Sequence, residues 1–346
     1  MPYIDDVDYD KITAIKTERY VTPNDRLSQA VLTGEAQIIS ERYKMSSTDA
    51  PRYKTGKFKN HIVYVTMDAF LDKTLYEKHN EDGVFTIYGK ELIDVFDRAV
   101  YNAVLSIILA GNAYITVRQI LNVMTGKEKS EGQNYTEQQC QAIRFSLLKL
   151  MSMKIGIDAD KESSCFTYRG NPITKYFGPL LKIERVAFSM NGHTIDGYRY
   201  MGNVDNLEDL PILYQYAKAK GEIQTLPVNF LNTPCTKSDF TIRLQECLRY
   251  RISQMTPSSK ISNKITANYL EKELKFKEMQ DSTKRSAKKR MWDYAERILS
   301  EWIKQGVIKD FKWDYDKANS NVKTGVFITP IKPKKWLRNT ATLDLE

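Results

Sequence analysis

The sequence contains few of the residues from which metal and catalytic sites are usually built. It has three histidines and four cysteines among 346 residues. The histidines, His61, His79 and His193, never stand at ligand spacing, and no C-x-x-C pair occurs, so no zinc site is predicted. The patterns G-x-x-x-x-G-K-[ST], G-x-G-x-x-G and H-E-x-x-H are also missing. We therefore predict a protein that is not an enzyme and that needs no metal or cofactor.

Long apolar runs are missing as well. No stretch approaches the ~20 consecutive apolar residues that span a bilayer, and the apolar segment around Val104–Ala110 is broken by Ser106. The first ten residues are acidic and lack the apolar core of a signal peptide. These absences favour a cytoplasmic protein without a membrane partner. In that compartment isolated cysteines usually behave as small buried hydrophobic residues, which is what we expect of Cys140, Cys165, Cys235 and Cys247.

Positive charge is concentrated in the last third of the chain. The formal net charge is +9. From Lys237 to the end there are 24 basic and 14 acidic residues, which leaves 28 basic and 29 acidic residues before it. Charge that serves solubility alone would not need this segregation. A basic region in an otherwise balanced protein indicates a polyanionic partner, most often nucleic acid.

Hydrophobic periodicity divides the chain into an arm and two similar halves. Residues 1–58 are polar without a sustained period and predict a flexible N-terminal arm. Residues 59–205 predict three helices and then a β-hairpin, with strands at 154–160 and 165–170 around K-E-S-S. A second hairpin is predicted around Asn191-Gly192. Residues 206–235 predict a connecting helix at 207–220 and an exposed, proline-bearing linker at 225–234.

The second half, residues 236–332, repeats this order, and residues 333–346 form a basic tail. Helices are predicted at 237–255, 261–274 and 283–305, followed by a strand at 307–314, an exposed tip at 316–324 and a return strand at 325–330. Both halves therefore share the order helix, helix, long helix, strand, turn, strand. We predict a helix-rich α+β fold with two winged helix-turn-helix domains in tandem.

The segment K-R-S-A-K-K-R opens the third helix of the second half. This is the element that enters the major groove of DNA in helix-turn-helix proteins. On a helical wheel the inward positions are Ala287, Met291, Tyr294, Ile298 and Trp302, and the cations Lys289, Arg290, Arg297 and Lys304 fall on the far side. The alternative is a solvated helix face without a ligand. The predicted DNA contacts of this helix are Lys284, Arg285, Ser286, Lys288, Lys289, Arg290 and Arg297.

Two further groups of residues are candidate DNA contacts. Lys317 and Lys323, in the exposed tip, suit phosphate contact. The third helix of the first half carries less charge, but glutamine can pair with adenine in the major groove. An ordinary polar helix face explains the same residues equally well. The outward or flanking residues predicted for that helix are Gln138, Gln141, Arg144 and Lys149.

The stretch F-D-R-A-V-Y-N-A-V-L-S-I-I-L-A-G-N-A-Y-I-T-V-R-Q-I-L-N-V-M-T-G, residues 96–126, resembles replication proteins of Firmicutes mobile elements. The overall layout resembles plasmid replication initiators built from tandem winged helices. The resemblance implies that the C-terminal domain binds origin repeats in double-stranded DNA. It also implies that the N-terminal domain mediates dimerisation or adds DNA contacts, and that host replication proteins are further partners. The residue-level match covers about thirty residues, and the long arm and the Asn191-Gly192 insertion depart from the pattern.

Two functions remain open at this point. The first is a replication initiator of a plasmid, phage or integrated element, which binds DNA sequence-specifically. The second is a winged-helix transcriptional regulator, for which the region 180–220 would supply a dimerisation or ligand module. A protein that coats DNA without sequence preference is a third interpretation. Two joined winged helices favour the initiator, because one chain can then span adjacent stretches of duplex.

Overall fold

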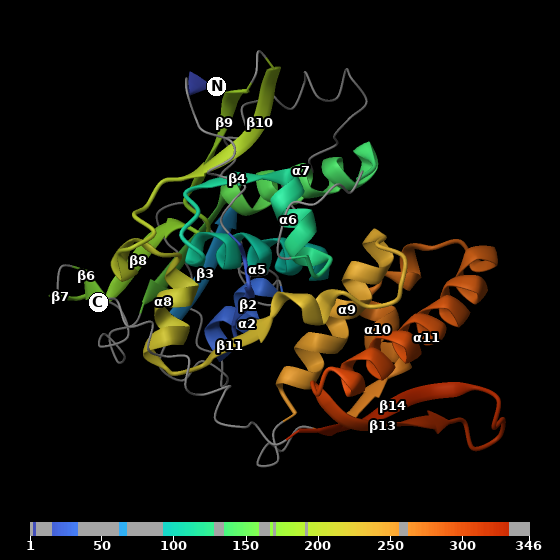
Figure 1. Ribbon diagram of the computed structural model, residues 1–346. Helices are drawn as coiled ribbons and strands as arrows, with labels where there is room; N and C mark the ends of the chain where they lie inside the picture. Colours follow the sequence, from blue (N-terminus) through green and yellow to red (C-terminus); the bar gives the residue numbers. More distant parts are fainter. Residues whose placement is uncertain are drawn as a thin grey trace. The chain divides into compact units, whose positions relative to one another are not determined.

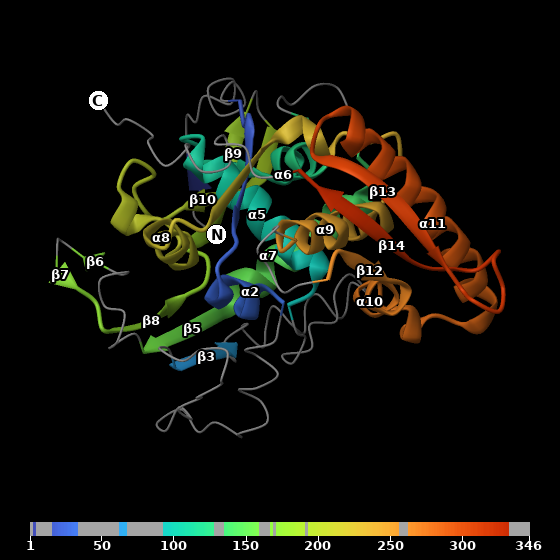
Figure 2. The same cartoon turned by 90° about the horizontal axis from the view of Figure 1, so that it is seen from below.

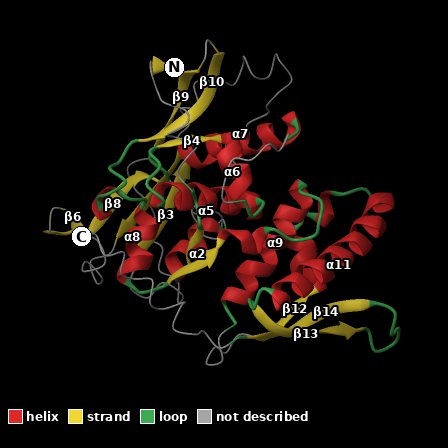
Figure 3. Ribbon diagram, viewed as in Figure 1, coloured by secondary structure: helices red, strands yellow, loops and turns green. Residues whose placement is uncertain are grey.

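The computed structural model of the chain describes residues 3–4, 16–33, 62–67, 93–127, 135–158, 167–168, 171–190, 193–255 and 262–331 (Figure 1). Its architecture mixes α-helices with several small β-sheets (Figure 3). The chain divides into two compact units. None of the described helices is both long and apolar enough to cross a membrane. The first unit comprises Met1–Thr17, Val21–Leu121 and Lys129–Ile223, and the second comprises Glu18–Tyr20, Asn122–Glu128 and Gln224–Glu346.

The first unit is built around helix α5 (Val95–Leu109), in which every residue from Val95 to Ile108 is buried. Asp94 starts the helix through a capping box with Asp97. The chain continues through β4 (Tyr114–Thr116) and α6 (Val117–Met124) to α7 (Glu137–Ser152), which packs against α5. Ile143, Leu147 and Leu150 of α7 are fully buried, so this helix packs into the first unit through one apolar face.

A long hairpin pairs back onto β4. Its strands are β9 (Ile183–Met190) and β10 (His193–Tyr200), on either side of the predicted Asn191-Gly192 turn (Figure 1). β10 is antiparallel to both β9 and β4. β1 (Tyr3–Ile4) adds a parallel strand at the β9 edge, so the sheet order is β1–β9–β10–β4.

The prediction that a β-hairpin directly follows the third helix of the first half is wrong. β5 (Met153–Asp158) follows α7 without a turn and pairs with β3 (Ile62–Met67) and β8 (Lys175–Pro179). In the predicted return strand, 165–170, the described residues form β6 (Thr167–Tyr168), which pairs with β7 (Asn171–Pro172) instead. Met153, Ile155 and Ile157 are buried, and a strand with neighbours on both edges is an interior strand, not half of an exposed hairpin.

The expectation of a flexible arm over residues 1–58 is wrong for residues 16–33. These form β2 (Arg19–Pro23), which pairs with β11 (Ile223–Pro227), and α2 (Arg26–Leu32). Leu27 and Val31 lie four residues apart on one face of α2 and are both buried. Apart from Tyr3–Ile4, the other residues of the predicted arm lie outside the described part of the chain. A short amphipathic helix inside a polar stretch is too brief to show as a sustained period.

Among its described residues from Asp239 on, the second unit has three α-helices and a three-stranded sheet. In chain order these are α9 (Asp239–Ser253), β12 (Lys264–Thr266), α10 (Ala267–Glu273), the 3-10 helix η4 (Phe276–Glu278), α11 (Asp281–Lys304), β13 (Ile308–Tyr315) and β14 (Lys323–Pro330). The sheet order is β12–β14–β13, and the β13–β14 hairpin lies along α11 (Figure 2). The sheet of the first unit has the matching order β4–β10–β9, in which a short strand pairs with the second strand of a later hairpin.

The predicted linker at 225–234 is exposed only in part, because buried and exposed residues alternate along it. The 3-10 helix η2 (Leu207–Asp209) and α8 (Ile212–Ala219) precede it, and its own residues form β11 and the 3-10 helix η3 (Val228–Leu231). Val228 and Phe230 are buried. The indole Nε1 of Trp302 donates a hydrogen bond of 3.0 Å to the carbonyl oxygen of Phe230. The apolar side chains between Pro227 and Pro234 therefore complete the core of the second unit.

Candidate nucleic-acid interface

Helix α11 presents the basic segment K-R-S-A-K-K-R in a defined orientation. Its C-terminal part is anchored in the core by Met291, Ile298 and Trp302, each fully buried. Ala287, the one apolar residue inside the basic segment, is also fully buried. Because Ala287 faces inward, helical geometry turns most of its basic neighbours away from the core. The inward residues predicted for this helix are confirmed at these four positions.

The cations of the segment differ in how they are held. Arg285 and Lys289 are exposed and form no ion pair with another described residue. Lys284 lies 2.9 Å from Asp281, and Lys288 lies 2.6 Å from Glu271 of α10. The hydroxyl of the exposed Ser286 donates to the carbonyl oxygen of Thr283 at 2.9 Å, so this side chain is turned toward its own helix.

Arg290 and Arg297 share an aromatic support. The Arg290 guanidinium lies 4.8 Å from the centre of the Phe240 ring on α9, and that of Arg297 lies 5.8 Å from the Tyr294 ring. The two rings contact each other edge to face, with centroids 6.2 Å apart. Both arginines are exposed residues. Their guanidinium groups are therefore positioned by the aromatic rings and remain accessible to solvent. A positioned guanidinium loses less entropy when it binds a base edge or a phosphate.

The β13–β14 tip holds its two predicted contacts differently. Lys317 is exposed in a turn that Asp316 organises by accepting hydrogen bonds from the amides of Ala318 and Asn319. Lys323 instead pairs with Glu296 of α11 at 3.1 Å and lies 3.9 Å from the Trp313 ring centre. Lys323 therefore ties the hairpin to α11, whereas Lys317 is available at the tip.

The corresponding helix of the first unit has most of its polar side chains engaged within the unit. Gln138 is exposed, but Gln141 and Arg144 both donate to the same carboxylate oxygen of Glu137, at 2.6 and 2.7 Å. These short-range bonds within one helix keep the side chains along its surface. Nothing in the geometry of α7 assembles a cationic surface like that of α11.

The prediction that Lys149 faces outward is wrong. Its side chain is 6% exposed, and its ammonium group lies 2.5 Å from the carboxylate of Asp97 on α5. Burial raises the pKa of the Asp97 carboxyl above its usual value, and the neighbouring Asp94 acts in the same direction, while Lys149 opposes both. The pair satisfies two charges inside the core and removes Lys149 from any interface.

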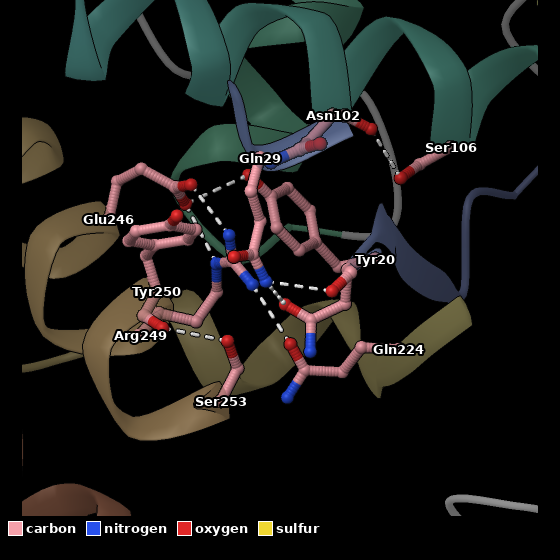
Figure 4. Close-up of polar contacts among 10 residues, drawn as sticks. Tyr20, Gln29, Asn102, Ser106, Gln224, Glu246, Arg249, Tyr250 and Ser253 are labelled. Carbon is pink, nitrogen blue, oxygen red and sulfur yellow. Dashed lines mark hydrogen bonds and ion pairs between the residues drawn. The ribbon is translucent and has the colours of Figure 1, made fainter. Parts of the chain in front are cut away.

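A buried polar cluster in the second unit uses another basic residue (Figure 4). Arg249 forms two hydrogen bonds to the carboxylate of Glu246, at 2.6 and 2.8 Å, and one to the side-chain oxygen of Gln224 at 3.0 Å. Its guanidinium also lies 5.6 Å from the centre of the Tyr20 ring. Arg249 therefore holds the second unit together, and the basic surplus of this region is not all surface charge. The i,i+3 spacing of Glu246 and Arg249 was the only sequence signal of the pair.

The prediction that the cysteines are buried can be checked at three of the four positions. Cys235 and Cys247 are buried and Cys140 is half-buried, whereas Cys165 lies outside the described residues, as does the basic tail at 333–346.

No protein family, curated protein or solved structure matches the chain.

Proposed function

We propose that this chain binds double-stranded DNA sequence-specifically through two winged helix-turn-helix domains in tandem, and that it acts as a replication initiator of a plasmid, phage or integrated mobile element. The second unit supplies most of the affinity. DNA recognition of this kind needs no catalytic group, so the proposed protein is not an enzyme.

The order of elements supports the winged-helix interpretation. In the second unit a short strand follows the first helix, two further helices come next, and a terminal hairpin pairs back onto the short strand. The first unit has the same order in α5, β4, α6, α7, β9 and β10 if the segment from β5 to β8 is treated as an insertion. Proteins with this layout place the third helix in the major groove.

The observation that carries the proposal is the exposed basic surface at the N-terminal half of α11. Arg285, Lys289 and Arg290 are exposed there while Ala287 and Met291 bury the opposite side. An α-helix with its side chains is about 10–12 Å across, so the first turns of α11 (Asp281–Lys304) match a major groove about 12 Å wide. Arginine can bond a guanine edge with two parallel hydrogen bonds.

The choice of initiator over regulator is supported by the layout and by the resemblance of residues 96–126 to replication proteins of mobile elements. Two domains in one chain can contact adjacent stretches of duplex without a second subunit. A regulator acting at a single palindromic operator would instead be expected to require a dimer.

Selection of genomic fragments by the purified full-length protein, followed by sequencing, tests both parts of the proposal. Tandem repeats beside a replication gene are the expected result. A palindrome within a promoter would replace the initiator with a regulator. Fragments without a common motif would show binding without sequence preference, and recovery of no DNA at moderate salt would overturn DNA binding itself.

A further inference from the structure

A cleft of about 830 Å³ lies between α10, η4 and the first turns of α11 in the second unit. Five basic side chains line it, three of them from α11 and two from the α10–η4 segment that precedes it. They are Lys272, Lys277, Lys284, Arg285 and Lys288. The cleft is therefore built by the turn between the second and third helices, beside the outward face of α11.

The charges around the cleft do not balance. Glu271 and Asp281 also line it, but each is paired with one lysine, at 2.6 Å for Lys288 and 2.9 Å for Lys284. Lys272, Lys277 and Arg285 are exposed and form no ion pair with another described residue. Three uncompensated positive charges in one hollow repel one another, and a bound anion would relieve this repulsion.

The chain segment that carries Lys272 and Lys277 is anchored in the core of the second unit by Phe276. The chain turns after α10 through Lys275, which has a φ of 57°, a left-handed conformation that is rare for residues other than glycine. Phe276, which follows, is buried and stacks on Phe240 with ring centroids 6.4 Å apart. Lys272 precedes this turn in α10 and Lys277 follows it in η4, and both line the cleft. The two lysines are therefore presented by a fixed backbone and not by a loose loop.

We propose that this cleft binds phosphate groups. A lysine ammonium acts as a point charge toward phosphate, and an arginine guanidinium donates two parallel hydrogen bonds to it. Where the phosphates are those of a DNA backbone, the proposal rests on the proposed function, and Lys272 and Lys277 then hold the strand beside the groove that α11 enters. A free polyphosphate presents the same chemistry, so the source must be separated by experiment.

The first arm measures duplex binding by the full chain at several salt concentrations. The variant Lys272→Ala/Lys277→Ala should weaken specific and random duplex by the same factor, about tenfold, and lower the salt slope by about two, because two phosphate contacts are lost. The matched control is Lys304→Ala/Lys309→Ala, which removes the same charge near the other end of α11. Since Lys304 lies 20 residues from Lys284, the two sites are about 30 Å apart along the helix.

If the cleft variant and the control bind duplex equally well, the cleft does not hold the DNA backbone, and only the second arm can then support it as a phosphate site. The second arm measures the Tm of the wild type and of both variants with added tripolyphosphate. A rise in Tm that the cleft variant alone loses supports the cleft as a phosphate site, even if the wild type binds no duplex and the proposed function fails. If the Tm of the wild type does not rise and the cleft variant binds duplex more weakly than the control, the cleft binds the DNA backbone only. If the Tm does not rise and the two variants bind duplex equally well, the cleft proposal is overturned.

Discussion

Helices α7 and α11 occupy the same place in the element order of their units, yet they use their polar residues differently. In α7 the basic side chains form ion pairs within the unit: Arg144 pairs with Glu137 on the same helix, and Lys149 pairs with Asp97 in the core. In α11 an inward-facing alanine leaves Arg285 and Lys289 in solvent. The same position in the element order therefore does not give two helices the same function. A helix can present a basic surface only where its lysines and arginines are not already paired with carboxylates of the same unit.

Lys149→Met is expected to have the largest effect, because it leaves the Asp97 carboxylate buried without its cation. The free energy of unfolding should fall by about 3–5 kcal/mol, as measured by denaturant unfolding. Lys289→Met on α11 is the matched control and should change stability by less than about 0.5 kcal/mol. Asp97→Asn combined with Lys149→Met should recover much of the loss, since neither charge then remains. Equal effects of the two single variants would erase the contrast between the helices.

Arg290→Ala is expected to weaken binding to a specific duplex by about 1–3 kcal/mol if the side chain reads a guanine edge. Unlike Lys289, Arg290 also stacks on Phe240, so its loss should reduce stability by about 0.5–1 kcal/mol. Phe240→Leu separates the two effects, because it removes the aromatic support and keeps the guanidinium. Affinities for specific and random duplex provide the measurement. The same loss on both would mean that Arg290 contacts phosphate and reads no base.

Lys289→Ala should weaken binding to all duplexes alike and lower the salt slope by about one, because one phosphate contact is lost. Arg144→Ala on α7 should leave the slope unchanged, because Arg144 is engaged with Glu137. Titration of duplex at four or more salt concentrations measures both slopes. A lower slope for Arg144→Ala alone would reverse the comparison and move the interface to the first unit.

The smallest expected effect is a pH dependence of the β13–β14 sheet. Hydrogen bonds from Lys264 and Thr324 lower the pKa of Asp314 below its ordinary value of 3.8. Since the folded pKa lies below the unfolded one, the stabilisation is present above about pH 4 and is lost as the pH falls through the folded pKa. Asp314→Asn should remove this part of the acid dependence in thermal unfolding between pH 5 and pH 2. An unchanged acid profile would show that these hydrogen bonds contribute nothing to stability.

Local sequence signals placed the helices well. Thr136 with Gln139 forms a capping box at the start of α7. Ser238 caps α9, close to the predicted start of that helix at 237. The apolar spacing of α11 identified its buried face. These features depend on residues three or four apart, so a single sequence window contains them. The mixed α and β composition of the fold follows from the same kind of signal.

Pairings between distant residues were decided only in the folded chain. The strands Tyr114–Thr116 and Lys264–Thr266 have three residues each and pair with strands some 60–80 residues further along, too short and too remote for any local period to reveal. Lys149 looked like an outward cation because its partner Asp97 lies on another helix. Helix positions, the buried face of α11 and the basic surplus of the last third could be predicted from the amino-acid sequence. Which hairpin completes each sheet and which charges remain in solvent could not, because strand pairing and ion-pair burial depend on chain segments that only folding brings together.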